Sequence, residues 1–588
     1  MLDLNTINDV LKIAARGTDE TVALEKISAT EWKPVTSKQF YGRIRACVEL
    51  LQRWGIQRGD RVALVSENRW EWAVVDFAIL AIGAIDVPLY QTLSPEQMGF
   101  ILNDSGCKAF FLSSKQQFQK LTQAGEIPTL EHVCIFDKGD FANTEAFSEV
   151  TQAASGMEEQ SSGFNAMLDD VKPEDIATIV YTSGTTGDPK GVVLTHKNLA
   201  DNLRHSTDGL RLQPGYKSIS FLPLSHALAR HLDYAIYANK AIPAYLPKFD
   251  DLAGAMKAVQ PEVFIAVPRV FEKIRQGVEH KSSHGLKKTI FNWALSTGAK
   301  HRTEIMEGKT PSSLGWKIAD KLVFSKIREA FGGHVVFYVS GSAPLGMDSS
   351  NWFLDVGIRI FEGYGLTETS PVLSRNTFDG YRIGTTGTLI PNIEVRTAAD
   401  GEIEVRGTSV FSGYWQKEDE YKKQFTEDGW FKTGDIGKLE DGFLSITDRK
   451  KELIKTSGGK YIAPQPIEGK LKADVLVSNA AVIGDTRKFA AVIISPNFVA
   501  LERWAASNGV STKDHAALAG DPAVKKQYEA LIKKVNATLE HHETLKKVYI
   551  APEEWTVESG ELTPSMKLKR RVILEKYKDN IDALYGGE

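Results

Sequence analysis

Residues 181–196 (YTSGTTGDPKGVVLTH) gather side chains that are able to bind a polyphosphate. Gly184 and Gly187 let the backbone turn its N–H groups inward without obstruction from a Cβ atom. Lys190 supplies a cation, and neighbouring hydroxyl groups add hydrogen-bond donors. The hydroxyl residues are Thr182, Ser183, Thr185 and Thr186. Their types and spacing predict a cradle for the phosphates of a nucleotide.

The alternative is an ordinary polar hairpin turn, because Gly, Ser, Thr, Asp and Pro dominate turns. A chain reversal needs only a few such residues, whereas here they run from Thr182 to Gly191, broken only by Lys190, which favours the phosphate interpretation. A Walker loop is excluded, since Gly191 rather than Ser or Thr follows Lys190, and the spacing from Gly184 differs from G-x-x-x-x-G-K-[ST]. We therefore expect another architecture to hold the nucleotide.

Short apolar runs flank this stretch at residues 175–181 and 191–194, which predicts two strands joined by the phosphate-binding segment. Two more predicted strands, residues 335–339 and 358–361, run into SGSAPL and EGYGLTETS. In α/β sheets, ligands bind where strands end, so these segments are candidates for the nucleotide site.

The two segments offer the groups that a nucleotide needs. Gly341, Ala343 and Pro344 are expected to form one wall of a flat slot for adenine, with Tyr364 opposite. Thr367 is able to donate to the α-phosphate. Glu368 is an acceptor-only oxygen ligand of the kind that Mg²⁺ requires.

Three single residues have both a functional and an ordinary interpretation. Asp435 follows a tight Thr-Gly turn and is able to accept from both ribose hydroxyls, or it merely caps the turn. His226 follows an apolar strand and a proline near the predicted site, although most lone histidines serve as hydrogen-bonded core or surface residues. Lys567 lies in a Lys/Arg-rich tail, where lysines are usually only solvated.

The stretch TSGTTGDPKG resembles, at every position, the phosphate-loop signature of the adenylate-forming superfamily, which includes acyl-CoA synthetases, peptide-synthetase adenylation domains and luciferases. Residues 428–468 read almost continuously like the signature of long-chain fatty acyl-CoA synthetases. The resemblance implies two steps. A carboxylate attacks the α-phosphorus of ATP and releases pyrophosphate, and a thiol then displaces AMP from the acyl-adenylate.

The resemblance also assigns roles to matching residues. It implies catalytic roles for Lys567, Thr182, Glu368, His226 and Lys455, and metal binding by Glu368 and Thr185. The positions expected to bind ATP or to line its site are Thr182, Ser183, Gly184, Thr185, Thr186, Gly187, Lys190, Gly341, Ser342, Ala343, Pro344, Glu362, Gly363, Tyr364, Gly365, Leu366, Thr367, Asp435, Arg449, Gly458, Gly459 and Lys460. The implied cofactors are ATP and Mg²⁺, with CoA as co-substrate.

The expected fold class is α/β, with a large N-terminal domain (1–447) and a smaller, mobile α+β C-terminal domain (448–588). Helical and strand patterns alternate through the first half and predict parallel strands. We expect two α/β subdomains and, from the alternating pattern after residue 384, a small antiparallel β-subdomain. The polar residues 137–174 are expected to form a solvated surface connection.

The resemblance places an inter-domain hinge at Asp448 and Arg449. Adenylation needs a cation near the reacting phosphate, while thioester formation needs the same space open to a thiol, so one rotating lid serves both steps. Lys567 would bridge the carboxylate and the α-phosphate in the first pose. Lys455 and the turn SGGKYIAP would be presented in the second.

Two segments leave alternatives open. Long-chain synthetases usually show a segment like LPLSH that ends in Glu-Arg, whereas here Ala229 precedes Arg230. Residues 261–331 are amphipathic and basic, with Phe291, Trp293 and Leu295 among Lys and Arg. They either rest on anionic lipid or form solvated helices that pack on their own domain.

The length, composition and charge of the chain argue against several classes of protein. A chain of 588 residues with 42% hydrophobic content needs more than one core. Its net charge of −4 argues against a nucleic-acid partner. Three widely spaced cysteines suggest neither disulfides nor zinc and fit a reducing cytosol. The N-terminal residues do not resemble a secretory signal, and the apolar stretch 72–89 contains two aspartates, so we expect buried core there and no membrane span.

The leading hypothesis is ATP-dependent ligation of a long-chain fatty acid to CoA, giving acyl-CoA, AMP and pyrophosphate. A second is an adenylating enzyme that transfers an acyl or aryl acid to a carrier-protein phosphopantetheine; no carrier-domain serine motif follows Lys567, which argues against a multidomain peptide synthetase. A third is a non-enzymatic adenylate-binding regulator. We expect a cytoplasmic monomer or homodimer, with peripheral association at an anionic inner membrane face left open.

Overall fold

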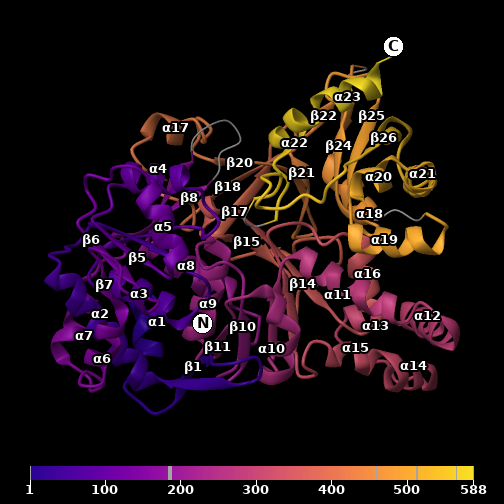
Figure 1. Ribbon diagram of the computed structural model, residues 1–588. Helices are drawn as coiled ribbons and strands as arrows, with labels where there is room; N and C mark the ends of the chain where they lie inside the picture. Colours follow the sequence, from indigo (N-terminus) through magenta and orange to yellow (C-terminus); the bar gives the residue numbers. More distant parts are fainter. Residues whose placement is uncertain (1, 183–188, 458–459, 511–513, 564–565, 587–588) are drawn as a thin grey trace.

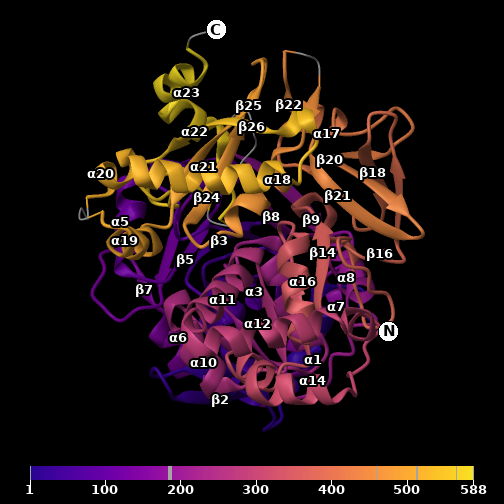
Figure 2. The same ribbon diagram turned by 90° about the vertical axis from the view of Figure 1, so that its right-hand side faces the viewer.

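The structure is a computed structural model that describes residues 2–182, 189–457, 460–510, 514–563 and 566–586. Two large sheets face each other across a layer of helices, and residues 450–586 form a separate body above them (Figures 1 and 2). The predicted site residues that lie outside the described residues are Ser183, Gly184, Thr185, Thr186, Gly187, Gly458 and Gly459.

The first sheet is largely parallel, as predicted. Among the described residues it holds eight strands in the order β19-β9-β8-β4-β3-β5-β6-β7. Their bounds are β19 (Gly413–Tyr414), β9 (Lys190–Thr195), β8 (Ile176–Thr182), β4 (Ile85–Pro88), β3 (Arg61–Val65), β5 (Ala109–Leu112), β6 (His132–Ile135) and β7 (Glu145–Ala146). Strands β8 and β9 pair antiparallel up to Thr182 and Lys190, so the two strands predicted on either side of this segment are confirmed.

The second sheet combines a parallel half with the antiparallel β-subdomain. The parallel half, with β2 antiparallel at its edge, contains β14 (Ile360–Gly365), β13 (Phe337–Ser340), β12 (Val263–Ala266), β10 (Lys217–Ser220), β11 (Ile242–Tyr245), β1 (Thr21–Lys26) and β2 (Trp32–Thr36). The antiparallel half contains β15 (Val372–Arg375), β16 (Thr388–Leu389), β21 (Phe443–Arg449), β20 (Phe431–Glu440), β18 (Glu402–Gly407) and β17 (Ile393–Thr397). Because β15 pairs with β14, the β-subdomain continues directly from the parallel strands.

Four helices fill the space between the sheets: α1 (Ile7–Ala14), α3 (Trp70–Ala81), α8 (His196–Ser206) and α9 (Ala227–Ala238). Helix α3 contacts β3 and β4 of the first sheet, and α9 contacts β10 and β11 of the second. Apart from α6 and α7, described below, the other helices of this part among the described residues are α2 (Ser37–Arg53), α4 (Pro95–Ser105), α5 (Lys115–Gln123), η1 (Phe249–Asp251), α10 (Leu252–Val259), α11 (Pro268–Lys281), α12 (Gly285–Ala299), α13 (Arg302–Met306), α14 (Leu314–Ala319), η2 (Asp320–Phe324), α15 (Ser325–Glu329), α16 (Met347–Asp355), η3 (Thr367–Thr369) and α17 (Glu418–Lys422).

Residues 137–174 differ from the surface connection that their polar composition predicts. They contain α6 (Phe147–Ala154) and α7 (Ser162–Asp170), and α6 packs on α2. Phe147 and Leu168 are buried, because a few apolar residues at helical spacing suffice to anchor an otherwise polar helix.

The C-terminal body has its own sheets and cores. A three-stranded sheet contains β24 (Val477–Ile483), β25 (Ala490–Pro496) and β26 (Leu545–Ile550), and β22 (Ile454–Lys455) pairs with β23 (Tyr461–Ile462). Its helices are α18 (Pro464–Lys472), α19 (Phe498–Ser507), α20 (His515–Gly520), α21 (Pro522–Asn536), η4 (His541–Glu543), α22 (Arg570–Lys576) and α23 (Lys578–Tyr585). Within the described part of the chain, the buried cores lie either before residue 448 or after residue 453.

Among the residues that the structure describes, no helix combines the length and the apolar character needed to cross a bilayer.

Candidate active site

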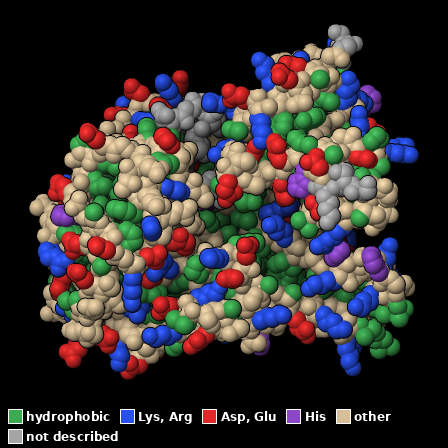
Figure 3. All heavy atoms as spheres, viewed as in Figure 1, with side chains coloured by type: hydrophobic (Ala, Val, Ile, Leu, Met, Phe, Trp, Pro, Cys, Tyr) green, Lys and Arg blue, Asp and Glu red, His purple; other side chains and the backbone are tan. Residues whose placement is uncertain are grey.

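A cleft of about 2610 Å³ lies between the C-terminal body and the carboxyl ends of the parallel strands. The central hollow in Figure 3 shows hydrophobic side chains inside it and Lys or Arg at its edge. The predicted residues that line it are Thr182, Lys190, His226, Gly341, Ser342, Ala343, Pro344, Glu362, Gly363, Tyr364, Gly365, Leu366, Thr367, Glu368, Asp435, Arg449 and Lys567. Segments separated by hundreds of residues thus meet at one surface.

Lys190 is held at the edge of the cleft by side chains that the sequence did not single out. It forms an ion pair with Glu420 and lies 5.4 Å from the ring centroid of Tyr414. The glycine that follows is required, because a Cβ atom on Gly191 would lie 2.6 Å from the Ile179 side chain. Lys190 is therefore fixed at the start of β9, opposite Thr182.

The end of β14 brings Tyr364 and Asp435 together. The Tyr364 hydroxyl donates to Asp435 across 2.6 Å, and Arg449 Nε lies 3.4 Å from the other carboxylate oxygen. Burial raises the pKa of Asp435. The positive charge of Arg449 and the hydrogen bond from Tyr364 act in the opposite direction. The turn after β14 requires glycine, because a Cβ atom on Gly365 would lie 1.6 Å from the Pro371 carbonyl oxygen.

Two glutamates of this segment have different surroundings. Glu362 accepts from the backbone N–H of Leu345 at 3.0 Å and so ties β14 to the SGSAPL turn. Glu368, in η3, accepts from the Tyr414 hydroxyl at 3.1 Å. Burial raises the pKa of Glu368. Carboxylate oxygens beside a cleft are able to bind a cation through their lone pairs.

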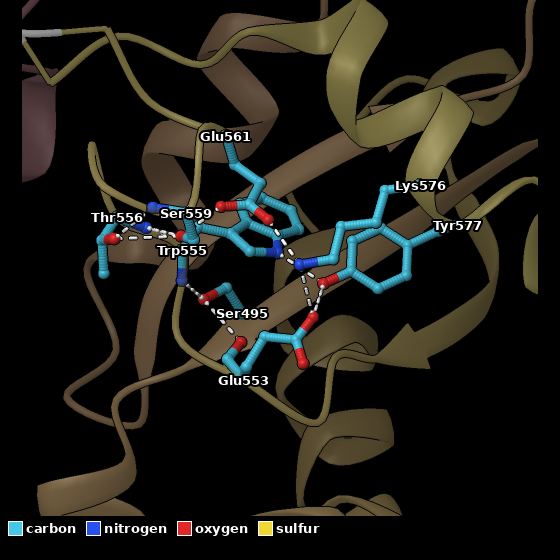
Figure 4. A network of polar contacts seen from close by, with 8 residues as sticks. All are labelled: Ser495, Glu553, Trp555, Thr556, Ser559, Glu561, Lys576 and Tyr577. Atoms are coloured by element: carbon cyan, nitrogen blue, oxygen red, sulfur yellow. Dashed lines mark hydrogen bonds and ion pairs between the residues drawn. The ribbon is translucent and has the colours of Figure 1, made fainter. Parts of the chain in front are cut away.

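Lys567 lies in a loop that is anchored at both ends. The backbone N–H of Lys569 donates to the Glu561 carbonyl at 2.7 Å. The backbone N–H of Thr563 donates to the Lys567 carbonyl, and the backbone N–H of Lys567 donates to the Thr563 hydroxyl. Figure 4 shows the anchor: Lys576 lies 2.5 Å from the Glu561 carboxylate and 2.6 Å from Glu553. The Trp555 indole N–H donates to the Tyr577 hydroxyl at 3.0 Å in the same network.

The charge of Lys567 is costly where the loop places it. Burial and the nearby Arg449 charge lower the pKa of Lys567 to about 8, while Asp435 and Glu368 act in the opposite direction. An ammonium group in this position favours the arrival of anions, because their charge offsets the lost solvation.

His226 caps the N-terminus of α9. Its Nδ1 accepts from the Leu228 backbone N–H at 3.2 Å, so the neutral ring carries its proton on Nε2. Burial and the Lys567 charge lower the pKa of His226 to about 4. At neutral pH the side chain is therefore a neutral hydrogen-bond donor at the cleft.

An apolar channel extends the cleft along the second sheet. Because side chains alternate along a strand, Val263 and Ile265 of β12 and Val339 of β13 face the same side. The facing stripe of α9 contributes Leu232 and Ile236. The channel also passes a polar pair, in which Ser206 Oγ lies 2.8 Å from His231 Nε2.

Two predicted residues lie elsewhere. Lys455 is exposed in β22, its ammonium 5.5 Å from the ring centroid of Tyr461, and Lys460 is exposed after the segment 458–459. Neither residue lines the cleft that holds Lys567.

Residues 11–415 match the family model described as AMP-binding enzyme, and residues 451–588 match the one described as AMP-binding enzyme C-terminal domain. The chain belongs to the AMP-binding enzyme family. The predicted family and fold class are confirmed.

Relatives of this AMP-binding enzyme match over most of its length. The long-chain-fatty-acid–CoA ligase FadD15 of Mycobacterium tuberculosis is 38% identical over 587 residues, covering 97% of this chain and 96% of that protein. Long chain acyl-CoA synthetase 7, peroxisomal, of Arabidopsis thaliana is 36% identical, covering 90% and 78%. Among solved structures, ATP-bound MatB from Rhodopseudomonas palustris has a TM-score of 0.69 at 23% identity, covering 98% of this chain and 99% of that one. The adenylation domain of a carboxylate reductase from Mycobacterium chelonae has a TM-score of 0.76 at 22% identity, covering 99% and 91%. The two structures show a shared fold.

The departure from the long-chain pattern at Ala229 and Arg230 has a structural setting in this AMP-binding enzyme. Arg230 points into the core, where it pairs with Asp76 of α3 and lies 3.0 Å from Asp86 of β4. All three are buried, and the Tyr234 hydroxyl also donates to Asp76 at 2.7 Å. The arginine thus holds α9, which carries His226 and one wall of the channel, against the first sheet.

The sequence did not indicate the channel, the roles of Tyr414 and Glu420, or the buried ion pairs of Arg230. The channel had a signal, the short continuous apolar runs at 263–267 and 337–339. Tyr414 and Glu420 had none, because their roles depend on a contact with β9 across more than two hundred residues.

Proposed function

We propose that the chain ligates a long-chain fatty acid to CoA through an acyl-adenylate, consuming ATP and releasing AMP and pyrophosphate. The observation that carries the proposal is the meeting, in one cleft, of Lys567 and Asp435 with an apolar channel suited to a hydrocarbon chain. The relatives named as long-chain ligases, which match over nearly the whole chain, support the same substrate class.

In the proposed first step, a carboxylate oxygen attacks the α-phosphorus and the bond to pyrophosphate breaks. Lys567 donates to the carboxylate and α-phosphate oxygens, where negative charge develops. Asp435 accepts from the ribose hydroxyls, and the neutral His226 donates from Nε2 at the channel mouth. Residues 182–190 bind the departing phosphates, with Thr182 and Lys190 at their two ends.

Adenine is proposed to lie between residues 341–344 and the Tyr364 ring. Gly363, Gly365, Leu366 and Thr367 border the nucleotide, and Glu362 fixes the turn opposite them.

Mg²⁺ is proposed to accompany the phosphates. The donor set fits, because Mg²⁺ usually binds through one or two carboxylates together with substrate phosphates and water. Glu368 supplies such a carboxylate, with Thr185 as the second proposed ligand. When bound, the ion would neutralise phosphate charge.

The second step is proposed to follow a rotation of residues 448–588 relative to residues 1–447. The separation of the cores around residues 448–453 supports this division. Asp448 accepts from the Gln465 backbone N–H at 3.2 Å and so connects the junction to α18. Rotation would withdraw Lys567 and present Lys455, Lys460 and the turn between them to the acyl-adenylate, where the CoA thiolate attacks the carbonyl and AMP leaves.

A fatty-acid length series in a CoA-dependent AMP-release assay tests the proposal. We expect long saturated acids to give the highest kcat/KM, and replacing CoA by a holo carrier protein to abolish turnover. Val339→Phe should shift the preference toward shorter acids, because the larger side chain fills the channel. Val395→Phe, the same change in β17 outside the channel, serves as the control. Absence of acid-stimulated ATP–pyrophosphate exchange would refute the adenylation step itself.

We further propose a cytoplasmic enzyme that meets its water-insoluble substrate at an anionic membrane face.

A further inference from the structure

The helices that follow α11 carry large apolar side chains on their outer side. We call this the α12–η2 surface, defined by the exposed residues Leu286, Trp293, Leu314, Ile318 and Leu322 with Lys287, Lys288, Lys317 and Lys321. Leu286 and Leu314 are 76% and 73% exposed, so they are almost fully in water. Clustered exposed apolar side chains of this size mark interaction sites.

The spacing of the apolar residues forms a stripe. Leu314, Ile318 and Leu322 are four residues apart along α14 and η2, which places them on one side of the helix. Trp316 and Phe324 face inward, with ring centroids 4.9 Å apart. The outer stripe is therefore additional to the residues that hold the helix on its domain.

A second stripe lies beside the first. Leu286 and Trp293 are seven residues apart on α12, about two turns. A Cβ atom placed on Gly315 would lie 3.5 Å from Thr297, which is one turn after Trp293. The side of α12 that bears Trp293 thus adjoins the start of α14, and hydrophobic side chains gather among Lys and Arg at the lower right of Figure 3.

The charge of this segment is opposite to that of the chain. Residues 285–329 contain nine Lys or Arg and four Asp or Glu, a formal charge of +5, against −4 for the whole protein. The Lys and Arg residues of the segment that form ion pairs within the described part of the chain are Arg302, Lys309 and Arg328. In the described part of the chain, none of the four lysines of the surface has an ion-pair partner.

The surface is mounted firmly on the domain that contains the cleft. Helix α12 approaches α16 so closely that a Cβ atom on Gly298 would lie 1.8 Å from the Asp355 carbonyl oxygen. Arg302 Nη2 lies 2.7 Å from the Asp355 carboxylate. The first residues of α16, Met347 and Asp348, line the cleft.

We propose that the α12–η2 surface docks the protein on an anionic lipid bilayer. The apolar stripes would enter the boundary between headgroups and acyl chains, and the flanking lysines would lie at the level of the anionic headgroups. A second copy of the same surface is a poor occupant, because the two copies would bring like charges together. The inference extends the proposed function by naming where the enzyme meets its lipid substrate.

Sedimentation of the full chain with vesicles tests the docking. We expect binding to vesicles of phosphatidylcholine and phosphatidylglycerol, weak binding to phosphatidylcholine alone, and a decrease with salt. Lys317→Glu/Lys321→Glu should weaken binding at least about 30-fold, since each lysine near such a surface contributes about 1 kcal/mol. Leu314→Ser/Ile318→Ser/Leu322→Ser should weaken it at least about tenfold on either vesicle.

Matched controls separate the docking from other effects. Lys525→Glu/Lys526→Glu changes the net charge equally on exposed positions of α21, and Val499→Ser removes an exposed apolar side chain of α19; both should bind vesicles like the wild type. All variants should release AMP normally with a water-soluble acid in the absence of vesicles, so a failure of the proposed reaction is distinguishable. Equal losses in the α21 variant, or a change in oligomeric state in place of vesicle binding, would overturn the proposal.

Discussion

Replacing Lys567 by alanine should separate the two half-reactions. The side chain lies within electrostatic reach of Glu368, Asp435 and His226, so it belongs to the pose in which adenylation would occur. We expect adenylate formation to fall by about 10²- to 10³-fold, the usual loss on removing one preorganised donor from a developing charge. Thioester formation from preformed acyl-adenylate should fall by less than about threefold, because in the proposed second pose Lys567 has left the cleft.

The structure also sets the sign of the pH dependence and of the stability change. Burial and Arg449 lower the pKa of Lys567 from 10.5 to about 8. This corresponds to at most ~3 kcal/mol of preference for the neutral amine, and solvent contact reduces it. Since the ammonium is the active form, kcat/KM for ATP should decline as pH rises through about 8. The unfolded chain binds the proton more tightly, so the wild-type charge destabilises the fold below this pH and Lys567→Ala should not lower the Tm at pH 7.

The assay is single-turnover formation of radiolabelled acyl-adenylate, followed separately by CoA addition to purified acyl-adenylate. Lys567→Arg should retain part of the activity and lose the decline near pH 8, because arginine stays protonated. Lys546→Ala, at an exposed lysine of β26, should match the wild type in both steps. Adenylate formation by Lys567→Ala within tenfold of the wild-type rate, or an equal fall of both half-reactions, would refute the role assigned to Lys567.

Three other substitutions test separate parts of the cleft and its support. Asp435→Ala should weaken ATP binding by about 100-fold in calorimetry, because two hydrogen bonds to a charged group are lost; Tyr364→Phe, which removes only the bond to Asp435, should cost less than tenfold. Lys455→Ala should show the mirror image of Lys567→Ala, with normal adenylate formation and slow thioester formation; a slow first step would contradict the two-pose scheme. Arg230→Met should lower the free energy of unfolding by about 3–5 kcal/mol in urea, because it leaves Asp76 and Asp86 as buried carboxylates without their partner. A loss below 1 kcal/mol would show that those carboxylates are already neutral.

The sequence predicted those parts of the site that depend on local patterns. The strands on both sides of residues 183–189 follow from apolar runs of fewer than ten residues and are confirmed. The ribose-binding role of Asp435 was likewise inferred from a local turn and stays a prediction. The parallel strands were predicted from the alternation of helical and strand patterns along the chain. The antiparallel subdomain was predicted from the alternating pattern after residue 384. Assigning a role to Lys567 required a resemblance, because a lysine in a basic tail has no local feature that separates it from a solvated one.

The parts that were missed depend on contacts between distant residues. Arg230 and Asp76 are 154 positions apart, so no local pattern connects the two charges. The apolar channel combines alternate residues of two strands with a stripe of α9, and the expectation of a solvated connection at 137–174 was wrong because α6 and α7 bury residues such as Phe147 and Leu168. Composition reports how polar a segment is, whereas burial depends on the partner that the fold supplies.

The anchored loop and the depressed pKa of Lys567 together give the proposed rotation a physical cause. Without nucleotide, burial and Arg449 both disfavour the ammonium of Lys567 in this pose. The phosphates of ATP reverse this balance by supplying negative charge beside the ammonium. Departure of pyrophosphate removes most of that charge. The first pose then loses its stabilisation at the point where the CoA thiolate needs access to the acyl-adenylate. The proposed rotation then needs no separate trigger, because the phosphate charge that stabilises the first pose leaves with pyrophosphate at the end of the first step.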